Sequence, residues 1–365
     1  MLYFLSDFSN FFGPLRLFEY VTFRAGAAAF TAFLIVACFG ARFASMLRRM
    51  NMQAASRYDG IIPAELLDKR KNSTPCMGGI LLIGASLLSS LLWLRPDGNG
   101  IGWILYVGTL GFALIGFIDD YRKVFYKERD GLKSRWKFLL LLLLSALIVT
   151  GFRLCGDLQA VMQEFYVPFI KRPVAVGAWW LPVLSVLVLV GTSNAVNLTD
   201  GKDGLASGCC IFSTLTYATF AYLMGHKIFA SYLNIPFVPE ISEAVVFSAA
   251  VGGACIGFLW HNCHPASMFM GDTGSLALGG AIGMLAVITR QEILLVVVGG
   301  VFVIEAVSVI IQVASVRLTG KRVFLCTPIH HHFERLNWTE TQIVVRFWIL
   351  SGLFALMALA TLKLR

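Results

Sequence analysis

Long apolar stretches, separated by short polar segments, dominate the hydrophobic pattern of this chain. A helix needs roughly 20 apolar residues to cross the hydrocarbon core of a bilayer. The connections leave no room for a separate soluble domain, so we predict a single polytopic transmembrane domain over residues 1–365. The fold class is an all-α integral membrane protein with about ten transmembrane helices, at 20–46, 77–95, 101–118, 138–154, 174–196, 205–225, 243–260, 275–289, 293–316 and 343–363.

Lysine and arginine are distributed unevenly over the connections between these stretches. The odd-numbered connections hold 18 of these residues and the even-numbered connections hold 6. Cytoplasmic loops of membrane proteins are enriched in both residue types. We therefore predict that the odd connections face the cytoplasm and that both termini lie on the opposite side.

Composition agrees with the membrane assignment. The chain is 57% hydrophobic and 14% charged with a mean hydropathy of +0.74, whereas soluble domains are about a quarter charged. The net charge of +9 has two explanations, which are attraction of the loops to anionic lipid headgroups and binding of a polyanionic substrate. The eight cysteines form no CxxC pair, and we interpret them as small apolar fillers rather than disulfides.

Carboxylates at the ends of apolar stretches are the main candidates for a functional site. A carboxylate beside the bilayer core is costly unless it is paired, hydrated or bound to a cation. Glu305 lies inside the ninth stretch, where it is either a buried hydrogen-bonded group or a functional one. The others lie in connections assigned to the cytoplasm: Asp119, Asp120, Asp200, Asp203 and Asp272.

The first pair lies in the segment FIDDYRK, residues 117–123. Neighbouring side chains on a helix point about 100° apart, so one of Asp119 and Asp120 can face a metal or phosphate while the other faces a second group. The alternative is a solvated helix end that continues into Arg122 and Lys123.

The second segment is NAVNLTDGKDGL, residues 194–205. Asn197, Asp200 and Asp203 supply oxygen ligands there, beside glycines that allow a ligand to approach the backbone. An ordinary turn between two helices is the alternative, because Asn, Asp and Gly favour turns as well.

The third segment is WHNCHPASMFMGDTGS, residues 260–275. Asp272 is predicted to cap the helix that follows, which is a place where anions and their metals bind. Capping alone does not account for the polar and aromatic residues upstream, which include Asn262, His264 and Phe269.

Two cationic segments complete the set. One of them, residues 328–338 with the sequence PIHHHFERLNW, contains three successive histidines. A zinc site is one interpretation, but the side chains of consecutive histidines diverge. Contacts between imidazole and phosphate fit better. DKRKNSTPCMGG, residues 68–79, is either a phosphate-binding approach to a helix N-terminus or a positive-inside anchor. Carboxylates and cations from distant loops suggest Mg²⁺ with phosphates, because phosphoryl transfer needs positioning and charge neutralisation.

Five segments of this chain resemble, in sequence and in order, the motifs of the phospho-N-acetylmuramoyl-pentapeptide transferase family. They are FIDDYRK, NAVNLTDGKDGL, FMGDTGSL, PIHHHFE and WTETQIVVRFWI. This family lies within the wider polyprenyl-phosphate N-acetylhexosamine-1-phosphate transferases, and the resemblance runs from about residue 68 to 350. It implies a ten-helix, Mg²⁺-dependent enzyme of the bacterial inner membrane, with periplasmic termini and an active-site cleft at the cytoplasmic face. Such an enzyme moves phospho-MurNAc-pentapeptide from UDP-MurNAc-pentapeptide to undecaprenyl phosphate among membrane lipids, giving lipid I and UMP. A homodimer is implied, and a nucleic-acid partner is not.

The resemblance also implies roles for individual residues. Asp272 is implied as a magnesium ligand, and Asp119 and Asp120 as groups beside the phosphates, one of them acting on the attacking lipid phosphate. Phe269 is implied to stack on uracil. The nucleotide pocket would be lined by Lys71, Asn197, Asp200, Asp203, Asn262 and Phe269, and the diphosphate or sugar side would be contacted by His330, His331 and His332.

The chain departs from the family pattern at three positions. Cys76 stands where a threonine is usual, which implies a weaker contact with the nucleotide. Lys202 stands where leucine is common and would add a cation near the diphosphate, and His261 replaces a usual aromatic residue.

The sequence is compatible with two routes of phosphoryl transfer and with two rival functions. A direct attack of the lipid phosphate is expected over a two-step route through a phospho-aspartate, because a phosphate dianion is already nucleophilic. The runner-up enzyme is an N-acetylglucosamine-1-phosphate transferase. An ion-coupled transporter would place its acidic residues near the bilayer midplane with repeat symmetry, and no repeat is evident.

Overall fold

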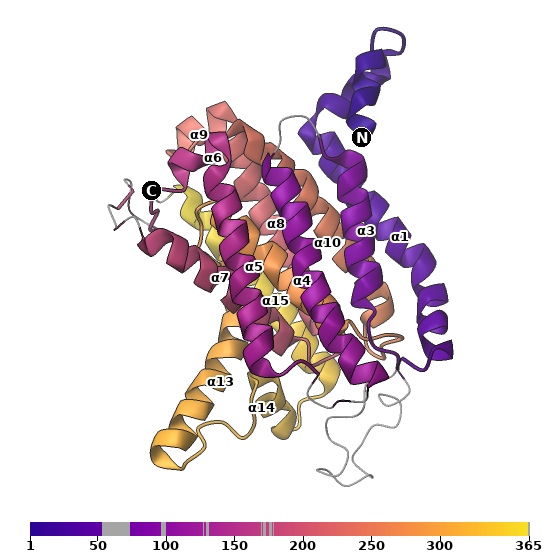
Figure 1. The fold of residues 1–365 in the computed structure, drawn as a ribbon, viewed down its shortest axis with the longest axis vertical. Helices are drawn as coiled ribbons and strands as arrows, with labels where there is room; N and C mark the ends of the chain where they lie inside the picture. The colour runs from indigo at the N-terminus through magenta and orange to yellow at the C-terminus, as the bar shows by residue number, and fades with distance from the viewer. Residues whose placement is uncertain are drawn as a thin grey trace.

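The computed structural model describes residues 1–52, 74–95, 100–126, 128, 131–168, 170, 173–174, 177 and 179–363. Apart from one bridge between Phe165 and Val174, the described secondary structure is helical, as predicted. Nine of the described helices are long and apolar enough to cross a membrane, by length and composition (Figure 1). They are α1 (Val21–Arg49), α4 (Gly100–Phe125), α5 (Ser134–Leu154), α7 (Trp180–Thr199), α8 (Leu205–Gly225), α10 (Ser242–Asn262, after the 3-10 turn Pro239–Ile241), α11 (Gly271–Ile288), α13 (Gly300–Thr319) and α15 (Glu340–Ala360, before the 3-10 turn Thr361–Lys363).

Two predicted stretches take a different form. The stretch 77–95 forms α3 (Gly79–Trp93), an apolar helix of 15 residues that is shorter than the other nine. The stretch 293–316 is interrupted between α12 (Leu295–Val298) and α13, where Gly299 and Gly300 follow one another. Glycine is among the poorest helix formers, so the pair lets the chain bend there. The other short helices are α6 (Gly156–Val161), α9 (Lys227–Leu233), α14 (Ile329–Arg335) and the 3-10 helices η1 (Leu2–Phe8) and η2 (Gly13–Glu19).

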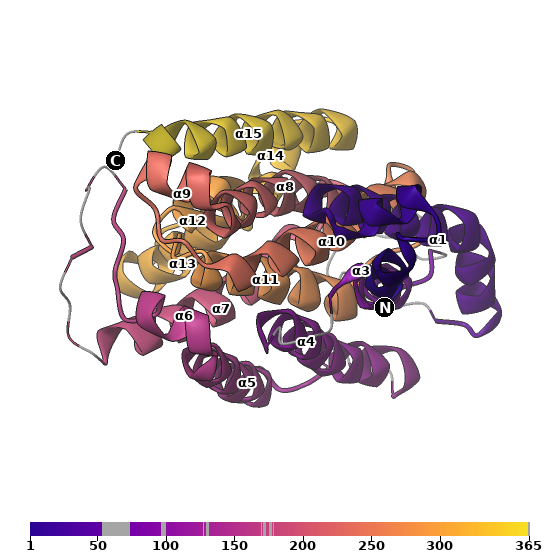
Figure 2. The same cartoon turned by 90° about the horizontal axis from the view of Figure 1, so that it is seen from above.

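Helix α11 forms the centre of the bundle. Figure 2, which looks along the long axis, shows it with α4, α7, α8 and α10 around it. Every residue from Asp272 to Ile288 is buried. Because α11 is buried on all sides, its first turn is held in a fixed position. This turn carries Asp272, one of the carboxylates described below.

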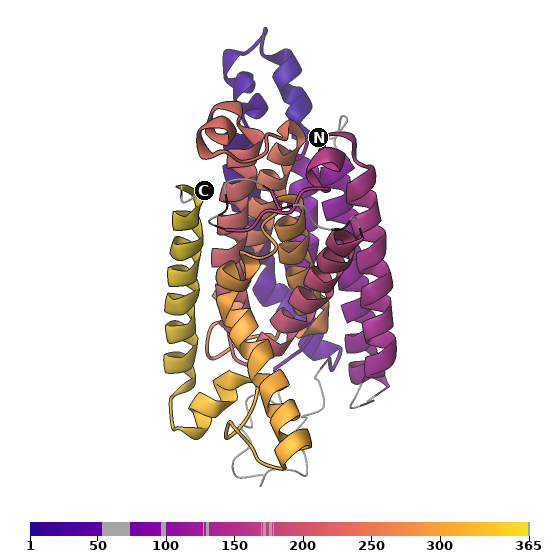
Figure 3. The ribbon, with the colours of Figure 1, turned by 90° about the vertical axis from the view of Figure 1, so that its left-hand side faces the viewer.

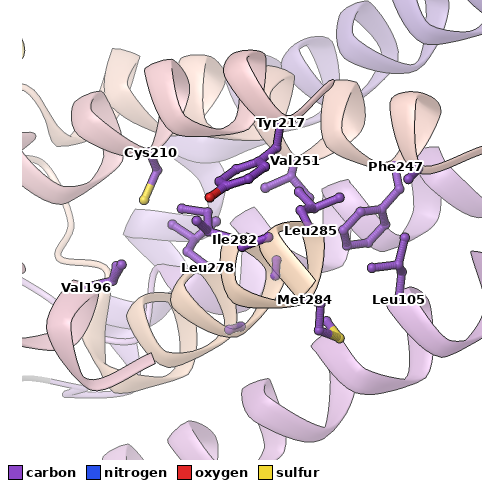
Figure 4. Close-up of a cluster of buried hydrophobic side chains, with 14 of the residues drawn as sticks. Leu105, Val196, Cys210, Tyr217, Phe247, Val251, Leu278, Ile282, Met284 and Leu285 are labelled. Carbon is purple, nitrogen blue, oxygen red and sulfur yellow. The ribbon is translucent and has the colours of Figure 1, made fainter. Parts of the chain in front are cut away.

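The core around α11 is built from aliphatic, aromatic and sulfur-containing side chains (Figure 4). Leu278, Ile282 and Leu285 of α11 lie against side chains of the neighbouring helices. Tyr217 comes from α8 and Phe247 from α10, and both are completely buried. Helix–helix packing in a membrane depends on this close van der Waals contact, because lipid offers an equally apolar environment.

The two ends of the bundle differ in what they contain. Figures 1 and 3 show η1 and η2 at one end of the long axis, while α14 lies at the other. Near the first end, Arg24 of α1 donates to both carboxylate oxygens of Glu243 of α10, at 2.7 and 2.6 Å. The backbone N–H of Arg95 donates to the same carboxylate at 2.9 Å. These buried charges are therefore paired with each other and link α1 to α10.

Candidate active site

Two helix ends bring three carboxylates together at the end of the bundle that carries α14. Asp119 and Asp120 lie in the last two turns of α4, and Asp272 is the second residue of α11. All three side chains are buried, and one oxygen from each lies within 4.8 Å of the other two. The structure thus joins two of the predicted aspartate segments in one cluster.

Close backbone packing explains this convergence. A Cβ atom at Gly116 of α4 would lie 2.2 Å from the carbonyl oxygen of Asp272. A Cβ atom at Gly79 of α3 would lie 2.3 Å from the backbone nitrogen of Gly274. Only glycine fits where a helix touches the backbone of another helix. Both α3 and α4 therefore contact the first turn of α11 directly.

Asp120 caps the N-terminus of α11. Its carboxylate accepts hydrogen bonds from the backbone N–H groups of Asp272 and Thr273, at 3.0 and 2.8 Å, and from the Thr273 hydroxyl at 2.7 Å. A negative charge is favourable at a helix N-terminus, where N–H groups lack partners. The prediction that Asp272 is the cap was wrong. The helix begins at Gly271, so Asp272 lies within its first turn, and the cap comes from α4.

Asp119 and Asp272 share two lysine ammonium groups. Lys123 Nζ lies 2.5 Å from Asp119 Oδ2 and 2.8 Å from Asp272 Oδ2. Lys137 Nζ, in the first turn of α5, lies 2.7 Å from Asp272 Oδ2 and 3.6 Å from Asp119 Oδ2. Two positive charges therefore face the two Oδ2 atoms. As the spacing on α4 predicts, Asp119 and Asp120 face different groups.

The remaining oxygens of this pair are held by uncharged donors. Asp119 Oδ1 accepts a hydrogen bond from the backbone N–H of Leu132 at 2.7 Å. Asp272 Oδ1 accepts one from Asn197 Nδ2 of α7 at 2.9 Å, and the same amide nitrogen lies 2.8 Å from Ser275 Oγ. The family resemblance assigns Asn197 to the nucleotide pocket and Asp272 to the metal. In the structure these two side chains contact each other.

The turn between α7 and α8 is fastened to the connection between α10 and α11. Asn262 Oδ1 accepts from the backbone N–H of Gly204 at 3.1 Å, and its Nδ2 donates to the carbonyl of Met268 at 2.9 Å. Asp203 Oδ2 lies 3.1 Å from His264 Nδ1 and accepts from the backbone N–H of Ala266 at 3.1 Å. The two polar segments predicted at 194–205 and 260–275 thus form one structural unit.

Other residues assigned to the nucleotide pocket lie around this unit. Asp200 is half-buried at the C-terminus of α7. Phe269 is half-buried, and its backbone N–H and carbonyl bond to Pro75 and Gly78, each at 2.8 Å. Cys76 lies in this same segment, and burial raises the pKa of its thiol. Lys71 lies outside the described residues.

The three histidines of α14 face different partners. His330 is completely buried, with Nδ1 3.1 Å from Glu305 Oε1 of α13. Its ring also lies against Gly201, where a Cβ atom would be 2.4 Å from Nε2. His332 Nδ1 accepts from the backbone N–H of Leu325 at 3.1 Å. The predicted divergence of consecutive histidines is confirmed.

His331, Glu334 and Lys202 form a chain of polar contacts between α14 and the turn after α7. His331 Nδ1 lies 2.9 Å from Glu334 Oε2, and Lys202 Nζ donates to Glu334 Oε1 at 2.7 Å. These contacts, first with His331 and then with Lys202, lower the pKa of Glu334 to about 2. Lys202 is thus engaged with α14. The third departure from the family pattern, His261, contacts the carbonyl of Ala37 on α1 at 3.1 Å.

Sequence reasoning missed three residues of this region. Lys123 was interpreted only as part of a solvated helix end, Lys137 enters the sequence analysis only as one of the 18 lysines and arginines of the odd connections, and Glu305 had no predicted partner. Lys137 comes directly before the apolar run at 138–144, a place where the positive-inside rule expects lysine anyway. The sequence contains no signal that separates such an anchor from a ligand-facing lysine.

Among the described residues, two groups have ligand atoms close enough for a metal ion. One is Asp119, Asp120 and Asp272, and the other is Asp203, His264 and Glu340. Oxygen-rich donor sets suit magnesium, whereas the second group mixes imidazole and carboxylate. The first group, with two lysines at the same oxygens, can hold both a cation and an anionic ligand.

Known proteins are similar to this chain over all or nearly all of its length. Residues 102–290 match glycosyl transferase family 4. A protein of Methylacidiphilum infernorum named phospho-N-acetylmuramoyl-pentapeptide-transferase is 44% identical over 369 residues, which cover 100% of both chains. Proteins with the same name are 46% identical in Desulfotalea psychrophila, over 97% of each chain, and 44% identical in Leptospira biflexa, over 98% of each chain.

Proposed function

The chain belongs to glycosyl transferase family 4, and within it to the phospho-N-acetylmuramoyl-pentapeptide transferases, and we propose that it moves phospho-MurNAc-pentapeptide from UDP-MurNAc-pentapeptide to undecaprenyl phosphate. The products are lipid I and UMP. The observation that carries this proposal is the arrangement of Asp119 and Asp272 around two lysines. Transfer between two phosphates requires a site that tolerates negative charge from both reactants, and paired acids and lysines meet that requirement.

The proposed location is the cytoplasmic face of the bacterial inner membrane, with both termini periplasmic. The excess of lysine and arginine in the odd connections supports this orientation, as does the clustering of the aspartates at one end of the bundle. A single transmembrane domain that works as a homodimer completes the proposal.

Mg²⁺ fits the donor set of this site. Asp119 Oδ2 and Asp272 Oδ2 share two ammonium groups, so the pair already accepts a charge of the size that a divalent cation carries. We assign Asp272 as a magnesium ligand, with Asp119 beside it. When bound, the ion supplies charge neutralisation to the phosphates.

The protein's own residues position this centre. Asp120 fixes the first turn of α11, and Asn197 orients the carboxylate of Asp272. Because Asp120 is occupied by three hydrogen bonds to α11, we assign Asp119 rather than Asp120 to the lipid phosphate that attacks.

The nucleotide is proposed to bind next to this centre. Asn262 fastens the turn that carries Asp200 and Asp203, and Phe269 is half-buried beside it, where its ring is available to stack on uracil. Lys71 belongs to the same proposal through its motif alone.

His331 and His332 are half-buried and are proposed to contact the diphosphate or sugar. His330, which is buried against Glu305, would act on that side by holding α14 against the turn at Gly201.

A direct transfer is the proposed route, without a covalent intermediate. Rapid quenching of the protein with labelled UDP-MurNAc-pentapeptide and no lipid should leave no labelled carboxylate. A trapped acyl phosphate on an aspartate would establish the two-step route instead.

The function is tested by UMP release from UDP-MurNAc-pentapeptide in detergent with undecaprenyl phosphate and Mg²⁺. Asp272→Asn should lower the rate by at least about 100-fold. Asp7→Asn, at an exposed position near the opposite end, is the matched control and should retain the rate. Preferred turnover of UDP-N-acetylglucosamine would instead identify the N-acetylglucosamine-1-phosphate branch.

A further inference from the structure

Each carboxylate of the Asp119–Asp272 pair has two oxygens with different kinds of partner. The Oδ1 atoms accept hydrogen bonds from uncharged donors, which are the backbone N–H of Leu132 and the side-chain amide of Asn197. The Oδ2 atoms face the ammonium groups of Lys123 and Lys137. One oxygen of each acid is therefore held by an uncharged donor, while the other is held only by lysine ammonium groups, which also donate hydrogen bonds to Asp272 Oδ2.

The two lysines are suited to leave these oxygens. They come from different helices, the last turn of α4 and the first turn of α5, and each side chain is 15% exposed. A lysine ammonium is a point charge on a flexible four-carbon stem, without the bidentate geometry that would hold an arginine in place. Loss of the lysine contacts would leave both Oδ1 hydrogen bonds intact, so the carboxylates would remain oriented.

The charges of this cluster balance without a metal ion. Two ammonium groups offset the charges of Asp119 and Asp272, while the charge of Asp120 faces the N-terminus of α11. A divalent cation at the Oδ2 atoms would place two further positive charges within a few ångströms of both lysines. Since like charges repel strongly in a partly buried site, a cation and two lysines do not share these oxygens favourably.

We propose that Lys123 and Lys137 are exchangeable counter-ions of this site. In the resting protein they neutralise Asp119 and Asp272; when a divalent cation takes the carboxylates, they turn to the diphosphate of the nucleotide substrate. This inference rests on the proposed function for the identity of the diphosphate. The lysines themselves become residues that position the substrate.

Exchange of this kind couples the binding of two ligands. The lysines oppose the cation when no anion is present to receive them, and they favour the anion once the cation has released them. By thermodynamic linkage, the diphosphate must raise the affinity for the cation by the same factor as the cation raises the affinity for the diphosphate. The site therefore binds the cation tightly only when the diphosphate is also present. Binding of the cation without substrate is disfavoured.

Binding of Mn²⁺ to the purified full-length protein in detergent, measured from the free-ion signal in electron paramagnetic resonance, tests the exchange without relying on turnover. Lys123→Met and Lys137→Met should each bind Mn²⁺ at least about fivefold more tightly than the wild type in the absence of nucleotide. Lys137→Arg, which retains the charge, should bind as weakly as the wild type. Lys133→Met, at an exposed position four residues before Lys137, is the matched control and should have no effect.

A second arm adds UDP-MurNAc-pentapeptide without lipid, with a protein-free sample to subtract binding of Mn²⁺ by the nucleotide. The wild type should gain Mn²⁺ affinity, and the two methionine variants should gain less. Unchanged or weaker Mn²⁺ binding by both methionine variants without nucleotide would overturn the exchange, even for a protein that releases UMP normally. Absence of UMP release together with tighter Mn²⁺ binding by the variants would instead retain the exchange and overturn the proposed function.

Discussion

Glu305 and His330 form a buried pair between α13 and α14, with Glu305 Oε1 3.1 Å from His330 Nδ1. Both residues are completely buried. The contact explains why a carboxylate lies within an apolar stretch, and it ties the histidine helix to a membrane-spanning helix. Glu305 thereby acts as a structural partner of the site rather than as a separate intramembrane acid.

Removal of this partner should destabilise the protein. Glu305→Ala removes the carboxylate that faces the buried imidazole and accepts from the backbone N–H of His330, and we expect the free energy of unfolding to fall by about 1–3 kcal/mol. Glu305→Gln retains an oxygen at the same position and should cost less. Chemical denaturation in mild detergent measures both, with Glu19→Ala at an exposed position as the control. Equal stability of Glu305→Ala and the wild type would show that the pair contributes nothing.

The same histidine should make stability depend on pH. Burial lowers the pKa of His330 below its ordinary value of 6.5. The unfolded chain then binds the proton more readily than the folded protein, so the free energy of unfolding should fall as the pH drops from about 6.5 towards the folded pKa. His330→Asn should flatten this slope between pH 7.5 and 5. Unfolding curves at several pH values provide the measurement, and identical slopes for His330→Asn and the wild type would contradict the assignment.

Asp119 and Asp120 should respond differently to the same substitution. Asp120 caps α11, so Asp120→Asn should lower the free energy of unfolding by about 1–2 kcal/mol. Asp119 faces the lysines, so Asp119→Asn should mainly change Mn²⁺ affinity in the presence of nucleotide. Denaturation and Mn²⁺ binding, measured on both variants, should rank them in opposite order. The same ranking in both measurements would mean that the two acids share one role.

Close packing of α4 on α11 should not tolerate one extra methyl group. A Cβ atom at Gly116 would lie 2.2 Å from the carbonyl oxygen of Asp272, so Gly116→Ala must push the two helices apart. We expect a loss of about 1–3 kcal/mol in the free energy of unfolding and a large loss of UMP release. Gly84→Ala on α3, where no atom lies within 4 Å of the added group, is the matched control. Normal activity of Gly116→Ala would show that the position of Asp272 is less critical than proposed.

Helix content and the different orientations of Asp119 and Asp120 could be predicted from the sequence because both rest on local signals. Apolar length predicts a span, and the spacing of Asp119 and Asp120 on one helix predicts that they face different groups. The interruption at Gly299 has a local cause as well, but a run of apolar residues on both sides conceals it. The lysine contacts could not be predicted, because Lys137 meets Asp272 only after α5 packs beside α4. The pairing of Glu305 with His330 joins α13 to α14 across an intervening loop, and nothing in either segment identifies the other.

Crystals of the protein grown with Mn²⁺ and UDP-MurNAc-pentapeptide would locate the cation by its anomalous scattering. We expect a peak within about 2.5 Å of a carboxylate oxygen of Asp272, next to Asp119, with Lys123 and Lys137 turned away from these acids. A peak at Asp203, His264 and Glu340 instead, with both lysines still on Asp272, would contradict it.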